Sequence, residues 1–260
     1  MIRLDGLTVV FAPGTVLETR ALCGIDLALP AGQFVTVIGS NGAGKSTLLN
    51  ALTGNVGLAA GRIEIDGQDV TAWSAPARAA LMARVFQEPL AGSCEALSIE
   101  ENLALAAARG RRRGLGAALS RELRDTFRAR LSSLGLGLER RLGDRMGLLS
   151  GGQRQVVSLV MATLAPMKIL LLDEHTAALD PKTADFVLDL TRRIVVEQRL
   201  TTLMVTHSMR QALDCGERTI MLHEGRICFD LEGARRAALE VADLISLFAE
   251  VRAEQPVEAL

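Results

Sequence analysis

A glycine-rich segment of this sequence has the residue types and spacing needed to hold a polyphosphate. It reads Gly39-Ser40-Asn41-Gly42-Ala43-Gly44-Lys45-Ser46-Thr47 and fits the pattern G-x-x-x-x-G-K-[ST]. Glycines in this pattern let the backbone curl so that its N–H groups face phosphate oxygens, and the helix that follows adds a positive dipole end. We expect Lys45 to reach the β- and γ-phosphates of a nucleoside triphosphate, Ser46 to ligate Mg²⁺ and Thr47 to contact the α-phosphate.

An acidic pair follows an apolar run further along the chain. Asp173 comes directly after Ile169–Leu172 and so stands at the C-terminal end of an expected strand, where parallel sheets present their ligands. We expect Asp173 to hold Mg²⁺, directly or through water, and Glu174 to be the general base for the attacking water. Acidic pairs also end strands without any catalytic role, but the glycine-rich segment favours the catalytic interpretation.

A second candidate anion site is Leu149-Ser150-Gly151-Gly152-Gln153. Ser150 and Gln153 have the spacing of a capping box that opens a helix. The two glycines allow close approach to an anion, and the unpaired N–H groups of the helix start would attract it. The alternative is a plain capped helix start.

Two isolated polar residues follow apolar strands. Gln87 comes after Val85-Phe86, and His207 ends a strand at residues 203–206. An isolated glutamine is usually a surface residue, and an isolated histidine is more often structural than catalytic. Residue type alone therefore gives neither of them a role.

The elements around these motifs predict an α/β fold. Residues 34–38, 169–172 and 203–205 are almost uniformly apolar and are separated by helical patterns, which is typical of a parallel sheet covered on both faces. One helix is expected from Lys45 to about Thr53. Another follows the start signal Asp180-Pro181 and continues to about Gln198.

Capping boxes and a turn predict the remaining helices and strands. A capping box at Ser98-Ile99-Glu100-Glu101 predicts a helix to about Arg109, and residues 117–134 predict a second one. Residues 62–66 with an Asp66-Gly67 turn indicate a small antiparallel layer. Residues 239–252 predict a late amphipathic helix, followed by a frayed end.

We therefore expect one domain over residues 1–260 with an insertion. Residues 1–87 and 165–235 would form the nucleotide-binding core with the antiparallel layer. Residues 88–164 would form a helical subdomain, and residues 236–260 a C-terminal helix and tail.

Composition argues against several classes of protein. The 29 basic and 30 acidic residues give a net charge of −1, and there is no tyrosine, so nucleic acid is not an expected partner. Four scattered cysteines without a C-x-x-C pair favour a reducing compartment over a zinc site. No apolar run approaches the roughly 20 residues that span a bilayer, and the first residues are not typical of a signal peptide. We expect a protein that stays in the cytoplasm.

In their order along the chain, residues 39–47, 85–87, 149–153, 169–174 and 205–207 resemble the ATPase subunit of an ATP-binding cassette (ABC) transporter. The resemblance runs from about Leu4 to about Gly233. It implies a P-loop NTPase (RecA-like) core with a parallel sheet, an inserted helical subdomain and a small N-terminal antiparallel β layer. It also implies ATP and Mg²⁺ as ligands and ATP hydrolysis as the reaction.

The resemblance gives roles to residues that are ambiguous alone. Gln87 would touch Mg²⁺ and the attacking water, and His207 would contact the γ-phosphate as the family's switch histidine. Residues 150–153 would close on ATP held by a second copy of the chain. Asp180 lies in the segment that crosses this dimer interface, and it also fits a helix cap.

Two positions depart from the family's common pattern. Phe11 stands where most relatives have the tyrosine that stacks on adenine, and the alternative for it is a core residue of an N-terminal strand. His175 follows Glu174 where proline is common. Residues 172–183 and 200–207 resemble a subgroup of bacterial importer ATPases linked to tryptophan, tyrosine or related small solutes. In that subgroup the ATPase works with a separate permease and a separate extracytoplasmic solute-binding protein.

This resemblance implies a peripheral subunit on the cytoplasmic side of the cell membrane. Residues 88–105 would dock the permease's coupling helix. Arg109 and Arg111–Arg113 form a basic cluster next to them, which is either a solvated loop or a contact with the permease or anionic lipid headgroups.

The same motifs and their spacing favour or disfavour other functions that ABC ATPases have. Chromosome and DNA-repair relatives need a long coiled coil, but only 62 residues lie between Gln87 and Ser150. A degenerate, non-catalytic module is disfavoured because every catalytic position holds the expected residue type. A soluble ABC ATPase module acting on a non-transport assembly scaffold has the same motifs and stays open.

Overall fold

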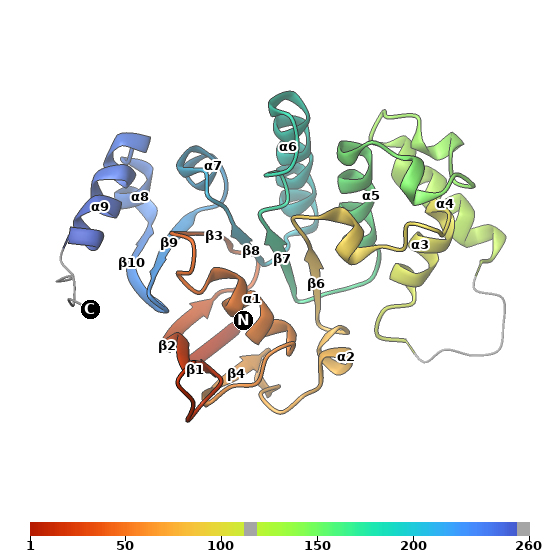
Figure 1. Cartoon of the computed structure of the whole chain (residues 1–260). Coiled ribbons are helices and arrows are strands. Elements are labelled where there is room, and N and C mark those ends of the chain that lie inside the picture. Colours follow the sequence, from red (N-terminus) through yellow and green to blue (C-terminus); the bar gives the residue numbers. More distant parts are fainter. Residues whose placement is uncertain (112–118, 254–260) are drawn as a thin grey trace. The chain divides into compact units, whose positions relative to one another are not determined.

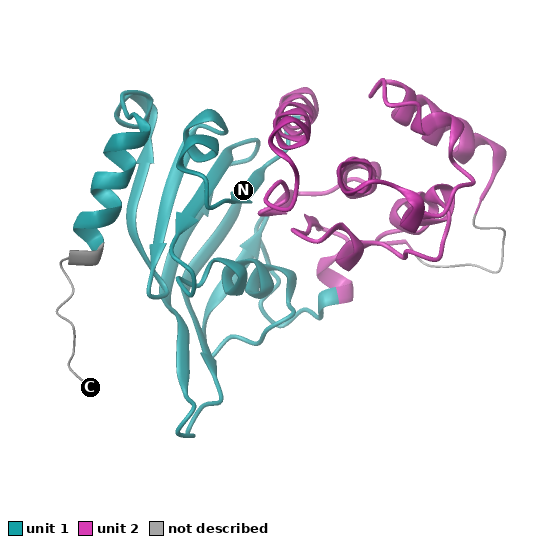
Figure 2. Cartoon of the chain, turned by 45° about the horizontal axis from the view of Figure 1, so that its top comes forward, with its two compact units in different colours: residues 1–75, 199–260 teal, residues 76–198 magenta. Residues whose placement is uncertain are grey.

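The computed structural model describes residues 1–111 and 119–253. These residues form two compact units, which are coloured separately in Figure 2. Unit 1 consists of Met1–Ala75 and Arg199–Leu260, and unit 2 consists of Pro76–Gln198. Arg112 and Arg113 of the predicted basic cluster lie outside the described residues, as do the first two residues of the helix expected at 117–134 and the expected frayed end.

An antiparallel sheet in unit 1 has the strand order β2-β1-β4-β5. Its strands are β1 (Ile2–Phe11), β2 (Thr19–Leu29), β4 (Ala60–Ile65) and β5 (Gln68–Asp69). Asp66 and Gly67 join β4 to β5 with φ angles of 50° and 78°. Two positive φ angles in sequence are typical of a tight hairpin turn, so the predicted turn and antiparallel layer are confirmed.

Four more strands of unit 1 pair in the order β10-β9-β3-β8. They are β3 (Phe34–Gly39), β8 (Thr202–Val205), β9 (Arg218–His223) and β10 (Arg226–Glu232). β3 is parallel to both β8 and β9 and is buried at every position. Burial on both faces explains its almost continuous apolar sequence and confirms the predicted parallel strands.

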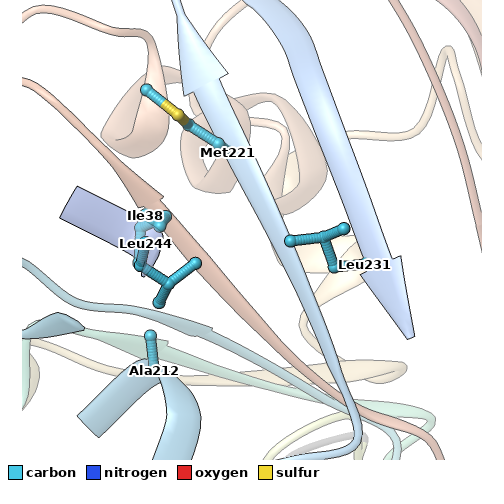
Figure 3. Close-up of a cluster of buried hydrophobic side chains, with 5 residues drawn as sticks. All are labelled: Ile38, Ala212, Met221, Leu231 and Leu244. Atoms are coloured by element: carbon cyan, nitrogen blue, oxygen red, sulfur yellow. The ribbon is translucent and has the colours of Figure 1, made fainter. Parts of the chain in front are cut away.

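Helices α7 (Met209–Asp214) and α9 (Val241–Ala253) pack on these strands through one apolar cluster. Figure 3 shows its buried members, which are Ile38 of β3, Met221 of β9, Leu231 of β10, Ala212 of α7 and Leu244 of α9. The late helix predicted from the sequence is therefore confirmed, and it completes the core of unit 1. The other helices of this unit are α1 (Lys45–Thr53) and α8 (Gly233–Ala237).

Unit 2 contains two parallel strands and a group of helices (Figure 1). The strands are β6 (Met82–Val85) and β7 (Ile169–Asp173), which pair from Met82 opposite Ile169 to Val85 opposite Leu172. The longer helices are α3 (Ile99–Ala107), α4 (Arg121–Ser132), α5 (Gly151–Leu164) and α6 (Pro181–Gln198). Short helical segments are η1 (Pro89–Gly92), η2 (Leu138–Arg140), η3 (Met146–Leu148) and α2 (Ala75–Arg78), the first residue of which belongs to unit 1.

Side-chain caps determine where the helices of unit 2 begin. Ser98 forms a capping box at α3 and Ser150 forms one at α5, as predicted. α4 begins later than predicted because the Oγ atom of Ser120 accepts the N–H of Leu123 and so caps the helix there. Over residues 1–111 and 119–253, no helix combines the length and apolar character needed to cross a membrane.

Candidate nucleotide-binding site

The glycine-rich segment, here called the P-loop (residues 39–47), turns between β3 and α1. Gly39 and Gly44 have φ angles of 155° and 100°. A Cβ atom on Gly39 would lie 2.3 Å from the carbonyl oxygen of Leu222, and one on Gly44 would lie 2.6 Å from that of Ala21. The curl of the loop therefore requires glycine at both positions.

The start of α1 is open to an anion. Gly44 is its N-cap, and within the described residues no side chain caps the helix and no acidic residue occupies its first turn. The first N–H groups of a helix lack intrahelical acceptors, and the helix dipole places partial positive charge there. Ser46 is exposed and Thr47 is half-buried in this turn, so the helix start also offers hydroxyl groups.

Lys45 is buried although lysine is rarely buried in proteins. Its Nζ atom donates to the carbonyl oxygens of Gly39 and Ser40, at 2.8 and 2.9 Å. The ammonium group is thus held within the curl of the P-loop. A cation beside an open helix start suits a ligand with several negative charges.

His207 lies at the same sheet edge as the P-loop. β3 and β8 are parallel neighbours with Val37 opposite Val205, so the P-loop and His207 follow the carboxyl ends of adjacent strands. His207 is exposed, and the next residue, Ser208, caps α7. Unit 1 therefore brings together two of the segments that the sequence singled out.

Phe11 ends β1 and is 44 % exposed, so the alternative that it is a core residue is wrong. It lines a hollow of about 520 Å³ in unit 1. Apolar side chains form much of the wall, among them Val9, Val10 and Leu58. The ring is accessible to an apolar or aromatic ligand group.

The acidic pair lies beside Gln87 in unit 2. β6 and β7 are parallel with Val85 opposite Leu172, so Gln87 and the acidic pair follow the carboxyl ends of two neighbouring strands. Gln87 is exposed, and Asp173 and Glu174 are half-buried. Glu174 has a φ angle of 45°, a conformation that non-glycine residues seldom adopt and that is concentrated at functional sites.

Arg84 is a partner of Asp173 that sequence reasoning missed. Its Nη2 atom donates to Oδ2 of Asp173 at 2.5 Å, and the side chains are only 9 % and 13 % exposed. A charged residue within the otherwise apolar strand Met82–Val85 was the available signal. Which carboxylate it meets depends on the pairing of β6 with β7.

His175, the residue that replaces the family's usual proline, is buried beside Glu174. Burial lowers the pKa of its imidazole from 6.5 to about 4. The ring is therefore neutral at physiological pH.

Residues 150–153 form the start of α5 as predicted. Ser150 and Gln153 each accept the other's backbone N–H at 3.2 Å. The two glycines differ in their surroundings, because a Cβ atom on Gly152 would lie 2.2 Å from Cγ2 of Thr183, whereas one on Gly151 would meet nothing closer than 3.8 Å. Gly152 thus serves the packing of α6, and Gly151 leaves an exposed helix start.

Asp180 caps α6. Its Oδ1 atom accepts the backbone N–H of Thr183 at 3.2 Å. Hydrogen bonds from the Thr183 side chain and backbone hold the pKa of this carboxyl below its ordinary value. The predicted cap is confirmed, and Asp180 is exposed on the segment that leads into α6.

Oxygen donors of the kind that Mg²⁺ prefers are present, but few in number. Across the described ranges, no three His, Cys, Asp or Glu side chains converge on a possible metal position. The hydroxyl of Ser46, the amide of Gln87 and the carboxylate of Asp173 are hard oxygen ligands. Sparse protein oxygens suit Mg²⁺, which is usually completed by phosphate oxygens and water.

Comparison with known proteins identifies relatives of this chain. Residues 22–177 match the protein family described as ABC transporter. A tyrosine transport ATP-binding protein of Clostridioides difficile (strain R20291) is 41% identical over 236 residues, which cover 91% of this chain and 92% of that protein. The aliphatic sulfonates import ATP-binding protein SsuB 1 of Rhizobium johnstonii is 38% identical, with 82% of this chain and 71% of that protein covered.

Solved structures with a similar fold are ABC cassettes. A dimeric structure of MJ0796, a bacterial ABC transporter cassette, has a TM-score of 0.76 and 29% identity, covering 89% of this chain and 98% of that chain. A dimeric post-hydrolysis state of MJ0796 bound to ADP and Pi has a TM-score of 0.75 over the same shares of the two chains. The predicted α/β P-loop NTPase fold is therefore confirmed.

Proposed function

This chain belongs to the ABC transporter family and is an ABC ATPase, and from that premise we propose that it drives import of a small solute through a separate membrane permease. One observation carries the proposal. The chain has two glycine-bearing helix starts, at α1 and α5, and within the described residues neither has an acidic residue in its first turn. Each is suited to a phosphate group.

Two such starts suit an ATP molecule bound between two copies of the chain. The P-loop of one copy would hold the triphosphate, and Ser150, Gly151 and Gly152 of the second copy would cover the γ-phosphate. In a symmetric pair each copy contributes both parts, so two ATP molecules are bound. Asp180 would lie in this interface. The similarity to MJ0796, whose structure is described as dimeric, supports this arrangement.

Each residue of the site would have a separate role in ATP hydrolysis. The ammonium of Lys45 would exchange its two carbonyl acceptors for phosphate oxygens. Glu174 would orient the attacking water and take its proton, and His207 would hold the γ-phosphate. Phe11 would stack on adenine.

Magnesium is the metal that the donor groups fit best. Ser46, Gln87 and Asp173 would hold it. When bound, Mg²⁺ supplies positive charge that offsets the charge developing on the phosphates.

A hollow in unit 2 suits the permease. It has a volume of about 680 Å³ and lies among β6, η1, α3 and α5. The described residues that line it include Leu105, which is 46 % exposed, and three arginines, Arg84, Arg109 and Arg111, but no acidic residue. An amphipathic helix of the permease with acidic side chains would complement this surface.

The solute is proposed to be tyrosine or a related small amino acid. Support comes from the 41% identity to a tyrosine transport ATP-binding protein, which covers most of both chains. An ATPase on the cytoplasmic side does not touch the solute. Selection would therefore lie with the permease and an extracytoplasmic solute-binding protein.

A pull-down from detergent-solubilised native membranes tests this function. Tagged chain with the substitution Glu174→Gln would be incubated with Mg²⁺-ATP, and the proteins that co-purify would be identified by mass spectrometry. We expect a multi-span membrane protein whose recovery requires ATP. Recovery of soluble partners alone, with the tagged chain missing from the membrane fraction, would contradict the proposal and favour an assembly-scaffold module.

A further inference from the structure

Arg84 occupies an unusual place for a charged residue. It lies in β6, opposite Leu171 of β7 and three positions before Gln87. The guanidinium is largely buried, with 9 % of the side chain exposed. Burial of a cation is costly unless the cation is paired. Arg84 is paired with Asp173.

The pair leaves the two oxygens of Asp173 in different environments. Oδ2 accepts the hydrogen bond from Nη2 of Arg84 at 2.5 Å. Oδ1 makes no hydrogen bond within residues 1–111 and 119–253. Carboxylates that bind metals are commonly held in this way, with one oxygen fixed by a neighbouring donor and the other directed to the metal.

Arg84 is itself held by the segment that leads to Gln87. Its guanidinium carbon lies 4.7 Å from the centre of the Phe86 ring, within the range of a cation–π interaction. The carbonyl oxygen of Phe86 in turn accepts a hydrogen bond from Nε2 of Gln155 in α5, at 3.2 Å. A continuous set of contacts thus links α5, the residue before Gln87, and the carboxylate of Asp173.

We propose that Arg84 is a positioning residue for the metal site. By binding Oδ2 of Asp173 it orients Oδ1 toward the divalent cation that accompanies ATP, and it thereby raises the affinity for that cation. The inference rests on the proposed function, because it takes Asp173 as a metal ligand. The aromatic contact with Phe86 fixes the direction from which the guanidinium approaches.

The opposite effect of Arg84 is also physically possible. A guanidinium charge near a metal repels it and lowers the negative charge available on the carboxylate. We take orientation as the larger effect, because Arg84 binds one oxygen of Asp173 and leaves the other for the metal. The test below distinguishes the two effects by the sign of the change.

The experiment measures Mn²⁺ binding rather than turnover. The Glu174→Gln chain, which is expected to retain ATP, would be compared with the double variants Arg84→Met and Arg84→Lys in the same background. Free Mn²⁺ would be followed by electron paramagnetic resonance in the presence of ATP. We expect Arg84→Met to weaken Mn²⁺ binding about tenfold, the size typical for loss of an outer-shell partner. Arg84→Lys should weaken Mn²⁺ binding less than Arg84→Met does, because lysine keeps the positive charge but lacks the planar guanidinium group.

A matched control removes a different arginine–carboxylate pair of unit 2. Arg124 binds Glu100 at 2.9 Å between α4 and α3, so Arg124→Met should leave Mn²⁺ affinity unchanged. Binding of a fluorescent ATP analogue in EDTA would be measured on every variant. Loss of nucleotide binding by the Glu174→Gln chain itself would overturn the proposed function. Normal nucleotide binding with unchanged or tighter Mn²⁺ binding after Arg84→Met would overturn the role of Arg84 alone.

Discussion

The Nε2 atom of His175 lies 3.0 Å from Oγ1 of Thr191, a buried residue of α6. Thr191 donates its own hydroxyl proton to the carbonyl oxygen of Val187 at 2.8 Å. Its oxygen must therefore accept from His175, which places the imidazole proton on Nε2. A neutral histidine thus ties the loop that carries Glu174 to α6, at a position where proline is common in the family.

This contact predicts a dependence of stability on pH. Burial holds the pKa of His175 at about 4 in the folded chain, compared with 6.5 for the exposed residue. Between these values the unfolded chain binds a proton here that the folded chain does not. The contribution of neutral His175 to the free energy of unfolding is therefore fully present above pH 6.5 and is lost as the pH falls toward 4. At about 1.4 kcal/mol per pKa unit, the loss amounts to about 3 kcal/mol.

Urea unfolding of nucleotide-free protein at neutral and mildly acidic pH measures this effect. The substitution His175→Gln removes the titrating group and should flatten the decline relative to the unchanged protein. His207→Gln is the matched control, because His207 is exposed. An equal decline in the His175→Gln variant and the unchanged protein would show that His175 is not responsible.

Glu174→Gln separates binding of ATP from its hydrolysis. The amide keeps the size and the backbone conformation of Glu174 but cannot take the proton of the attacking water. Phosphate release should fall by about 10² to 10⁴, the usual contribution of a general base. ATP binding should persist, and size-exclusion chromatography with ATP should show an accumulated dimer. Turnover at a comparable rate would remove Glu174 from the role of base.

Lys45→Ala tests the P-loop. The ammonium makes two charged hydrogen bonds in the loop, and we expect it to make equivalent ones to phosphate oxygens. Loss of one such bond is worth about 1.5–3 kcal/mol, so ATP affinity should fall about 10- to 100-fold. Fluorescence titration with an ATP analogue measures the change. Lys168→Ala is the control, since Lys168 is exposed immediately before β7. Unchanged affinity in the Lys45 variant would rule out the phosphate contact.

The local part of the fold was open to prediction from the sequence. β3, α1 and α6 were predicted because continuous apolar runs, glycines and caps are signals within a few residues of the element. The N-terminal antiparallel layer was predicted, but the bounds of β1 and β2 were not, because their period-two pattern is broken. Their register shifts near Leu7, and Gly6 and Gly24 have positive φ angles, so the apolar positions do not alternate regularly.

Contacts between distant segments were not predictable in the same way. Arg84 and Asp173 are 89 residues apart, and their pairing depends on the register of β6 against β7. His175 gave a clear signal as a departure from the family's proline. However, its partner Thr191 lies 16 residues further along, in the middle of α6, and the contact depends on how this helix packs against the loop. Motifs therefore indicate which residues are expected to contact a phosphate, but not which neighbouring residues hold them in place.

Gly152 shows that a motif residue can be required for packing. A Cβ atom there would lie 2.2 Å from Cγ2 of Thr183, so Gly152→Ala should destabilise the protein by about 1–3 kcal/mol, as overpacking usually does. Gly151→Ala is the matched control, because its Cβ would meet only Cδ2 of Leu179 at 3.8 Å. Thr183→Ser removes the clashing methyl group and keeps the backbone N–H that Asp180 accepts. Chemical denaturation should therefore show that the double variant recovers most of the loss. If Thr183→Ser gives no recovery, the contact with α6 is not the reason for glycine at position 152.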